Sequence, residues 1–242
     1  MNADPADGTS RRRTVRSFVR RGGRETAAQI RAWAELWPHY GVDYQAQPLD
    51  LAKVFARTAP CTLEIGFGDG EHLLERAALE PERNFLGIEV HRSGVGHLLN
   101  AAGAQELRNV RVICHDAVEV LQAQLAPGSL DEVQILFPDP WPKARHHKRR
   151  LIQTGFMTLL ASRLRPGGSL GLATDWAPYA EHMQFVLDAC PQFVAVADDS
   201  GSPAKRTPTR FERRGVQLGH GVKNFLLIHT PVERNIDVEV PR

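Results

Sequence analysis

Acidic side chains follow three successive apolar runs of the sequence, and a glycine-rich turn accompanies the first of them. Glu64 lies in the run EIGFGDG at 64–70, and Glu89 and Asp116 follow the next two apolar runs. Glycines spaced as GxGxG let the backbone turn sharply and approach a ligand closely. Acids beside such a turn repel a pyrophosphate but suit an amino group and a sulfonium cation. The pattern therefore favours S-adenosylmethionine over a dinucleotide.

Two of these acids have expected partners on an adenosine. Glu89 can accept both ribose hydroxyls, but a nicotinamide dinucleotide would use the same acid, so this residue indicates adenosine rather than one cofactor. Asp116 can accept the adenine amino group, or it can cap the helix that follows, and the two interpretations are compatible. Each acid alone is common at a strand end. Their occurrence at three successive strand ends is more specific.

A proline-rich run, FPDPWPK at 137–143, holds the most specific chemistry. Its three prolines alternate with other residues, and each fixes φ and removes a backbone donor. A loop stiffened in this way can hold Asp139 and Trp141 in fixed orientations, as group transfer to one defined atom requires. A purely structural turn would not explain an acid and an aromatic ring held between prolines.

Basic residues are concentrated in two clusters, although the 242-residue chain has a formal net charge of only +2. One cluster occupies the arginine-rich residues 11–24, and the other is Lys143, Arg145, Lys148, Arg149 and Arg150. Because the second cluster adjoins the proline loop, it favours a polyanionic partner such as RNA over a merely solvated helix face. His146 and His147 lie within it, and we expect them to face RNA or solvent rather than a metal.

From residue 61 onward, apolar strand patterns alternate with helical patterns. The expected strands are 62–66, 84–90, 110–114, 132–137, 169–173, 193–197 and 224–229. The expected helices in this region are 71–79, 94–102, 117–125, 150–164 and about 177–189. The polar stretch 198–221 is expected to separate the last two strands without a helix. Such alternation predicts an α/β fold with a seven-stranded, mostly parallel sheet, helices on both faces and an antiparallel edge strand. Residues 1–24 are expected to form a disordered basic arm, and 25–242 a single domain.

The three cysteines include no CxxC pair, so reduced thiols in a cytoplasmic protein are expected. No close Cys/His spacing suggests a metal site, and no apolar run reaches membrane-spanning length.

The run FPDPWPKARHHKRR at 137–150 resembles the signature of bacterial tRNA (guanine-N7-)-methyltransferases, which have a Rossmann-like class I methyltransferase fold. The likeness continues in EIGFGDG, in IEVHRSGVG at 88–96, in HDAVEV at 115–120, and in TDWAPYAEHM at 174–183. TRFERRG and LGHGV at 209–222 complete it, so it covers most of the chain from about residue 30 onward. Ser93 stands where the family pattern has proline, and no expected role depends on it.

The resemblance implies roles for residues in several of these motifs. It implies that Glu64, Glu89, Asp116 and Asp139 bind S-adenosylmethionine, with Asp139 also catalytic. It implies substrate contacts from Lys143, Asp175, Thr209, Arg210, Phe211 and Glu212. It places the run Arg145, His146, His147, Lys148, Arg149 and Arg150 on the RNA. It further implies that the target is a guanine in the tRNA variable loop, and it leaves open whether the protein is a monomer or a homodimer.

Guanine N7 carries an in-plane lone pair and no proton, so its methylation needs no general base. Catalysis should come from alignment and from carboxylates that stabilise the developing ring cation. We therefore expect Asp139 to stabilise charge or to position the guanine. Trp141 or Phe211 could stack on a splayed-out base, although core packing is as consistent with Phe211.

Three other functions fit part of the pattern. A methyltransferase acting on a protein or a small molecule would keep the acids but would not need the basic run, and another RNA is a further alternative substrate. A nicotinamide dehydrogenase would share the fold and Glu89, but it conflicts with acids beside the glycines. An RNA-binding protein without catalysis would not need acids at successive strand ends.

Overall fold

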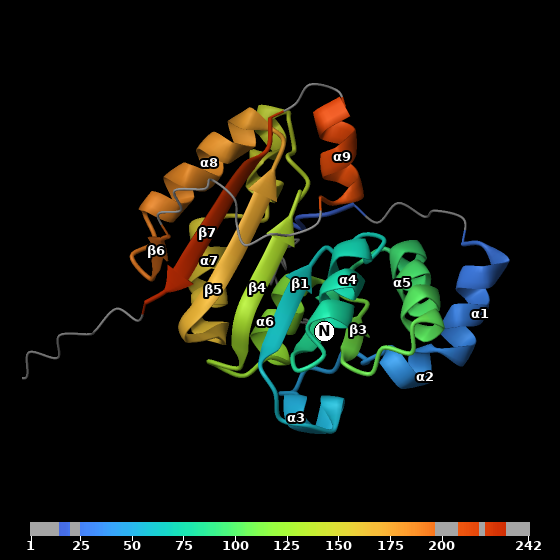
Figure 1. The fold of residues 1–242 in the computed structure, drawn as a ribbon. Coiled ribbons are helices and arrows are strands. Elements are labelled where there is room, and N and C mark those ends of the chain that lie inside the picture. The colour runs from blue at the N-terminus through green and yellow to red at the C-terminus, as the bar shows by residue number, and fades with distance from the viewer. Residues whose placement is uncertain (1–14, 20–24, 197–207, 218–220, 231–242) are drawn as a thin grey trace, which may run out of the picture.

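Buried apolar runs form the strands of one sheet, which is shown in Figure 1. The structure is a computed structural model that describes residues 15–19, 25–196, 208–217 and 221–230. Within these residues the sheet has seven strands in the order β3-β2-β1-β4-β5-β7-β6. The strands are β1 (Cys61–Ile65), β2 (Asn84–Ile88), β3 (Val110–Ile113), β4 (Leu130–Leu136), β5 (Leu164–Thr174), β6 (Phe193–Ala195) and β7 (Lys223–His229). Every residue of β1 and β2 is buried, as expected for strands covered on both faces.

The first five strands are parallel, and the last two complete an antiparallel edge. β1 pairs in parallel with both β2 and β4, whereas β7 runs antiparallel to β5 and β6. This arrangement confirms the predicted mixed sheet. The winding of the chain reverses between β1 and β4, and in such sheets ligands bind at the carboxyl ends of the strands beside that point.

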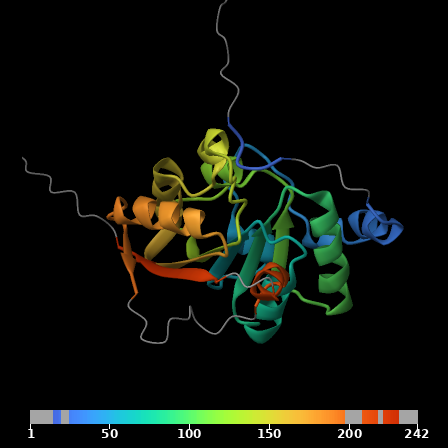
Figure 2. The same cartoon turned by 90° about the horizontal axis from the view of Figure 1, so that it is seen from above.

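Helices cover both faces of the sheet, as Figures 1 and 2 show. The helices are α1 (Ala27–Glu35), α2 (Trp37–Tyr40), α3 (Leu51–Phe55), α4 (Glu71–Leu79), α5 (Arg92–Ala104), α6 (Ala117–Ala123), α7 (Thr154–Arg163), α8 (Ala177–Asp188), α9 (Arg210–Gln217) and the 3-10 helix η1 (Ala144–Arg149). One apolar cluster joins the sheet to α6, α7 and α8. A second cluster joins it to α1, α2, α4 and α5. The core is therefore split into two layers by the sheet.

Two expectations about helices were wrong. The helix expected over 150–164 begins only at Thr154, because Arg150 is extended and ends the preceding 3-10 helix η1. The stretch 198–221, where no helix was expected, contains α9. Thr209 and Glu212 explain α9, because each side chain accepts a hydrogen bond from the other residue's backbone N–H, at 3.2 and 3.3 Å. The final two strands nevertheless pair as predicted.

A network of charged side chains stabilises the contact between α4 and the sheet. It lies at the amino ends of the parallel strands, away from the candidate site. Arg76 on α4 donates to both carboxylate oxygens of Glu132 on β4, at 2.5 and 3.0 Å, and its side chain also binds Glu80. Burial raises the pKa of Glu132, but the hydrogen bonds and charge of Arg76 outweigh burial and hold this pKa below its ordinary value. The carboxylate therefore adds stability near neutral pH, and this contribution is lost as the pH falls through the lowered pKa.

Replacement of Glu132 by glutamine is expected to lower the free energy of unfolding by about 3 kcal/mol at pH 7, because it leaves a largely buried cation with less compensation. The loss should shrink as the pH falls below the ordinary carboxyl pKa. Urea unfolding followed by circular dichroism measures it. Glu80→Gln is the control and should cost less, since the Glu80 side chain is 31% exposed against 13% for Glu132. Equal losses in both variants, or a loss independent of pH, would contradict this account.

Candidate active site

The glycine-rich turn after β1 is strongly bent and packs closely against its neighbours. Gly66 and Gly68 have φ values of 74° and 59°, in the region that favours glycine. A Cβ atom added at Gly94, near the start of α5, would lie 2.2 Å from the Gly68 carbonyl oxygen. A Cβ added at Gly66 would meet no atom within 4 Å. The turn is therefore fixed from behind by α5 and open on the side where a ligand can approach.

Glu89 lies at the end of β2, as predicted, and its buried carboxylate holds the glycine turn. One oxygen accepts the Gly68 N–H at 3.0 Å. The other oxygen accepts the N–H groups of Val90 at 2.6 Å and His91 at 2.9 Å. The same carboxylate thus fixes the backbone at two strand ends, and the oxygen beside Gly68 keeps a lone pair for a further donor.

Glu64 lies at the end of β1 and is also buried. His72 Nδ1 on α4 lies 2.8 Å from Glu64 Oε2, and both side chains are less than a tenth exposed. A pocket opens beside this pair. Its lining is Glu64, Gly66, Phe67, Gly68, Asp69, Glu71, His72, Leu136, Phe137 and Thr209. His72 therefore orients the acid that was expected to bind the cofactor.

Asp116 follows β3 and caps α6, because its Oδ1 accepts the Val118 N–H at 3.0 Å. The helix-capping interpretation is therefore confirmed, and the adenine contact stays a prediction. The pKa of Asp116 is raised above its ordinary value, mainly because the carboxyl group is buried. The Val118 N–H and the charge of Arg16 lower this pKa, and the charge of Glu119 raises it, but these effects are smaller than that of burial.

The proline loop after β4 is strained at both ends. Phe137 and Trp141 have φ values of 54° and 46°, which are costly for residues with a Cβ atom. Between them Asp139 is exposed, and no residue that the structure describes is shown hydrogen-bonded to its carboxylate. The loop adjoins the pocket, since Phe137 lines it. A carboxylate is thus held in place with its oxygens available to a ligand.

Arg150, which was expected on the RNA-facing surface, points inward. It is only 4% exposed, and its guanidinium donates to the carbonyl of Pro140 at 3.0 Å and to that of Pro178 at 3.4 Å. It also lies over the ring of Tyr179, 4.9 Å from the ring centre. Arg150 therefore ties the proline loop to the start of α8, and it serves the position of Asp139.

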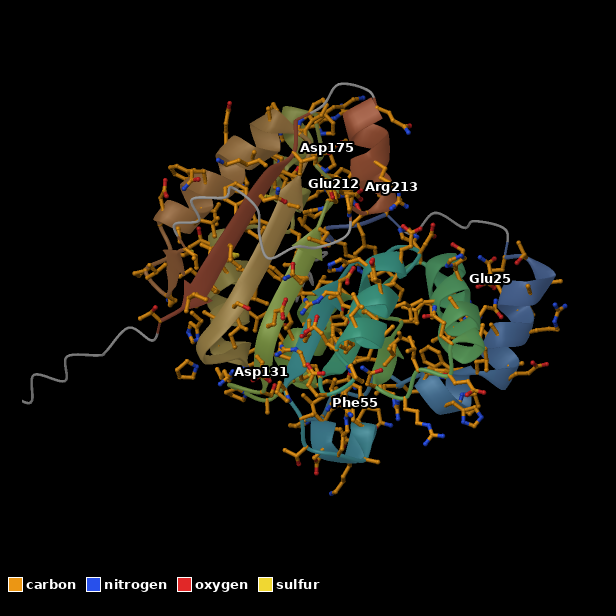
Figure 3. The ribbon with its side chains drawn as sticks, in the orientation of Figure 1. Glu25, Phe55, Asp131, Asp175, Glu212 and Arg213 are labelled. Carbon is orange, nitrogen blue, oxygen red and sulfur yellow. The ribbon has the colours of Figure 1, made fainter. Side chains whose placement is uncertain are left out.

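The expected substrate-binding residues of α9 gather at the same edge as the pocket. Figure 3 shows Asp175, Glu212 and Arg213 together at the carboxyl ends of the strands, far from Asp131 and Phe55 at the other end. A Cβ atom at Gly215 would lie 2.9 Å from Asp175 Oδ2, so α9 packs against the residue that follows β5.

The start of α9 is tied to α4 and to the pocket. Arg213 donates to Glu71 Oε2 at 2.7 Å, and Thr209 lines the pocket. The backbones of Arg210 and Phe211 belong to α9, and their side chains lie outside the described residues.

The rest of the basic run forms the outer surface of η1. Lys143, Arg145 and Lys148 are exposed, whereas Arg149 is half-buried. The pKa of His146 is lowered by partial burial and by the cations around it, so the imidazole is neutral at pH 7. The exposed members therefore concentrate positive charge next to the proline loop.

The described residues contain no group of three or more His, Cys, Asp or Glu side chains that could hold a metal ion. None of their helices is long and apolar enough to cross a membrane.

Several residues at this site were not expected from the sequence. His72 was missed because its partner lies eight residues earlier on a different element. The segment 15–19, which lies against the proline loop, was missed because its contacts join residues more than a hundred positions apart. The start of α9 could have been predicted, because Thr209 and Glu212 have the spacing of a capping box.

Known proteins are similar to this chain in sequence over most of its length. A family model described as a putative methyltransferase matches residues 58–225. The tRNA (guanine-N(7)-)-methyltransferase of Cronobacter sakazakii is 53% identical, over 88% of this chain and 91% of its own length. That of Thiobacillus denitrificans is 56% identical, over 90% of this chain and 96% of its own.

Solved structures of other methyltransferases have the same fold at low sequence identity. The 16S rRNA methyltransferase KamB matches with a TM-score of 0.54 at 16% identity, over 75% of this chain and 93% of its own. The aminoglycoside resistance methyltransferase NpmB1 matches with a TM-score of 0.51 at 14% identity, over 77% of this chain and 95% of its own. These likenesses confirm the expected methyltransferase fold. The family model and the close relatives show that the chain belongs to the tRNA (guanine-N(7)-)-methyltransferase family of enzymes.

Proposed function

We propose that this protein transfers a methyl group from S-adenosylmethionine to N7 of a guanine in tRNA and so forms 7-methylguanosine. The observation that supports it most is the open carboxylate of Asp139, held on a strained loop beside a pocket lined by glycines and by Glu64. The resemblance to the family adds the finer proposal that the guanine lies in the variable loop. An RNA-binding role without catalysis would leave this pocket unexplained.

The residues at the strand ends suit the cofactor. The lone pair left on the Glu89 oxygen beside Gly68 can accept a ribose hydroxyl, and Asp116 can accept the adenine amino group. Glu64, oriented by His72, can accept the amino group of the methionine part. The open side of Gly66 leaves room for the part of the cofactor that joins its adenosine to its amino group. When bound, the cofactor supplies a methyl group on a positively charged sulfur.

Asp139 acts on the guanine without taking a proton from N7, because that nitrogen carries none. The purine ring gains positive charge as the N7–methyl bond forms. A carboxylate at a fixed place stabilises this charge, and the fixed loop means that little reorganisation is needed during the reaction. Arg150 maintains that geometry through the Pro140 carbonyl.

The tRNA would lie across α9, the proline loop and η1. We propose that Lys143, Asp175, Thr209, Arg210, Phe211 and Glu212 contact the substrate. Thr209 and Glu212 cap α9, so their first contribution is to fix this helix at the pocket. The exposed cations Arg145 and Lys148 would contact phosphates. His146, His147 and Arg149 would lie on the same RNA-facing side, whereas Arg150 points inward.

Removal of one exposed cation from this run is expected to weaken tRNA binding and its salt dependence. Lys148→Gln should reduce the slope of log affinity against log salt by about one, since one phosphate contact is lost. Filter binding over a series of salt concentrations measures the slope. Arg108→Gln is a suitable control, because Arg108 lies before β3 at the other end of the sheet. An unchanged slope for Lys148→Gln would remove this residue from the interface.

Transfer of a labelled methyl group to unmodified tRNA tests the proposed function. The methylated tRNA is then treated with borohydride and aniline, which break the RNA at 7-methylguanine. The position of the break identifies the target nucleotide. We expect cleavage at a variable-loop guanine. Methylation of tRNA without such cleavage would mean that another atom is the acceptor, and label in protein alone would exclude tRNA as the substrate.

We further propose that the enzyme works in the cytoplasm without a metal ion, as a monomer or a homodimer, with 25–242 as one domain. Cys61, Cys114 and Cys190 form no disulfide with one another, which is consistent with a cytoplasmic protein. Residues 1–14 and 20–24 of the expected disordered arm lie outside the described residues.

A further inference from the structure

The proline loop and η1 hold three consecutive backbone carbonyls of the segment 15–19. Trp141 Nε1 donates to the carbonyl of Ser17 at 2.9 Å. Arg149 donates through Nε to the carbonyl of Arg16 at 3.1 Å and through Nη2 to that of Phe18 at 3.4 Å. Because all three acceptors belong to the backbone, the contacts fix the path of the segment whatever its side chains are.

The planar guanidinium of Arg149 makes this contact in a way that the ammonium group of a lysine could not. The guanidinium lies over the Trp141 ring, 4.3 Å from the ring centre, and at the same time reaches two carbonyls that are two residues apart. A planar group with several fixed donors can stack and span two acceptors together, whereas an ammonium group is a single point of charge. The half-buried Arg149 is therefore already occupied in the absence of RNA.

The segment 15–19 lies between the proline loop, whose Phe137 lines the pocket, and the residue that follows β3. Ser17 contacts Trp141 of the proline loop and Phe18 contacts Arg149 of η1. The charge of Arg16 acts on Asp116, which follows β3. In the sheet, β2 and β1 lie between β3 and β4, so the ends that bear Glu89 and the glycine turn lie between these two points. Figure 2, viewed onto this edge, shows the blue segment passing beside the 3-10 helix η1.

We infer that Arg149 is a positioning residue that fastens residues 15–19 over the adenosine half of the cofactor site. The segment then forms an outer wall of that site, and Arg149 acts on cofactor binding before any tRNA arrives. This inference rests on the proposed function, because it takes the pocket to hold S-adenosylmethionine.

The test uses Arg149→Lys in the full chain, which keeps the positive charge but removes the planar group. Titration calorimetry with S-adenosylmethionine, without tRNA, should give an affinity weakened about tenfold, the effect of losing one or two net hydrogen bonds. Hydrogen exchange followed by mass spectrometry should show faster exchange of peptides that cover 15–19. Arg31→Lys, an equally conservative change on exposed Arg31 of α1, should alter neither result.

Unchanged cofactor affinity and unchanged exchange in Arg149→Lys would overturn the inference and leave Arg149 as an RNA contact. Faster exchange with unchanged affinity would also overturn it, since the segment would then be fastened without forming part of the site. Wild-type protein that takes up no S-adenosylmethionine would instead contradict the proposed function, and the exchange result would still decide whether Arg149 holds the segment.

Discussion

Replacement of Asp139 by asparagine is expected to slow methyl transfer by about a hundredfold to a thousandfold, the usual cost of removing one group that stabilises charge in a transition state. Asparagine has nearly the same shape, so the strained loop between Phe137 and Trp141 should keep its path. What the variant loses is the negative charge beside the purine ring. A single-turnover rate, measured with cofactor and tRNA saturating, isolates this step from binding.

The matched control for this experiment is Asp188→Asn. Asp188 is the last residue of α8 and is exposed, so the same change of charge occurs away from the pocket. Its rate should equal that of the wild type. A wild-type rate in Asp139→Asn as well would show that the carboxylate neither stabilises the ring nor positions it.

Replacement of Glu89 by glutamine should weaken the binding of S-adenosylmethionine by about a hundredfold, since hydrogen bonds to a charged acceptor contribute about 1.5–3 kcal/mol each. The Glu89 carboxylate accepts three backbone N–H groups, from Gly68, Val90 and His91. The amide NH₂ of glutamine would face at least one of these donors. The variant thus disturbs the glycine turn as well as the ribose contact, and calorimetry without tRNA measures the loss.

Glu82→Gln is the control for that change, because Glu82 is exposed in the turn before β2, at the opposite end of the strand. Circular dichroism and thermal unfolding of both variants show whether the fold is kept. A folded Glu89→Gln protein with the affinity of the wild type would mean that the ribose is bound elsewhere.

The strand ends and their acids could be predicted because local patterns carry that information. Short apolar runs predict buried parallel strands, and the order of strands and helices predicts which ends meet at one edge. Glu64, Glu89 and Asp116 each lie at or just beyond the carboxyl end of a strand, as expected. The bend at Gly66 and Gly68 was predictable for the same reason.

The contacts that cross the molecule could not be predicted from these patterns. Arg150 belongs to a run of cations, which usually means solvent, and only the fold reveals the carbonyls that surround it. The segment 15–19 stands in an arginine-rich stretch, and this composition did not predict packing. Trp141 and Arg149 hold it through its backbone carbonyls. His72 could be paired with Glu64 only once α4 was seen to follow the glycine turn so closely.

We propose that a purine N7 is methylated beside the fixed carboxylate of Asp139. A tRNA transcript in which 7-deazaguanine replaces guanine tests it directly, because this base has carbon in place of N7. We predict that wild-type protein methylates the ordinary transcript and leaves the 7-deaza transcript unmethylated, while both compete equally for binding. Equal methylation of the two transcripts would contradict the account.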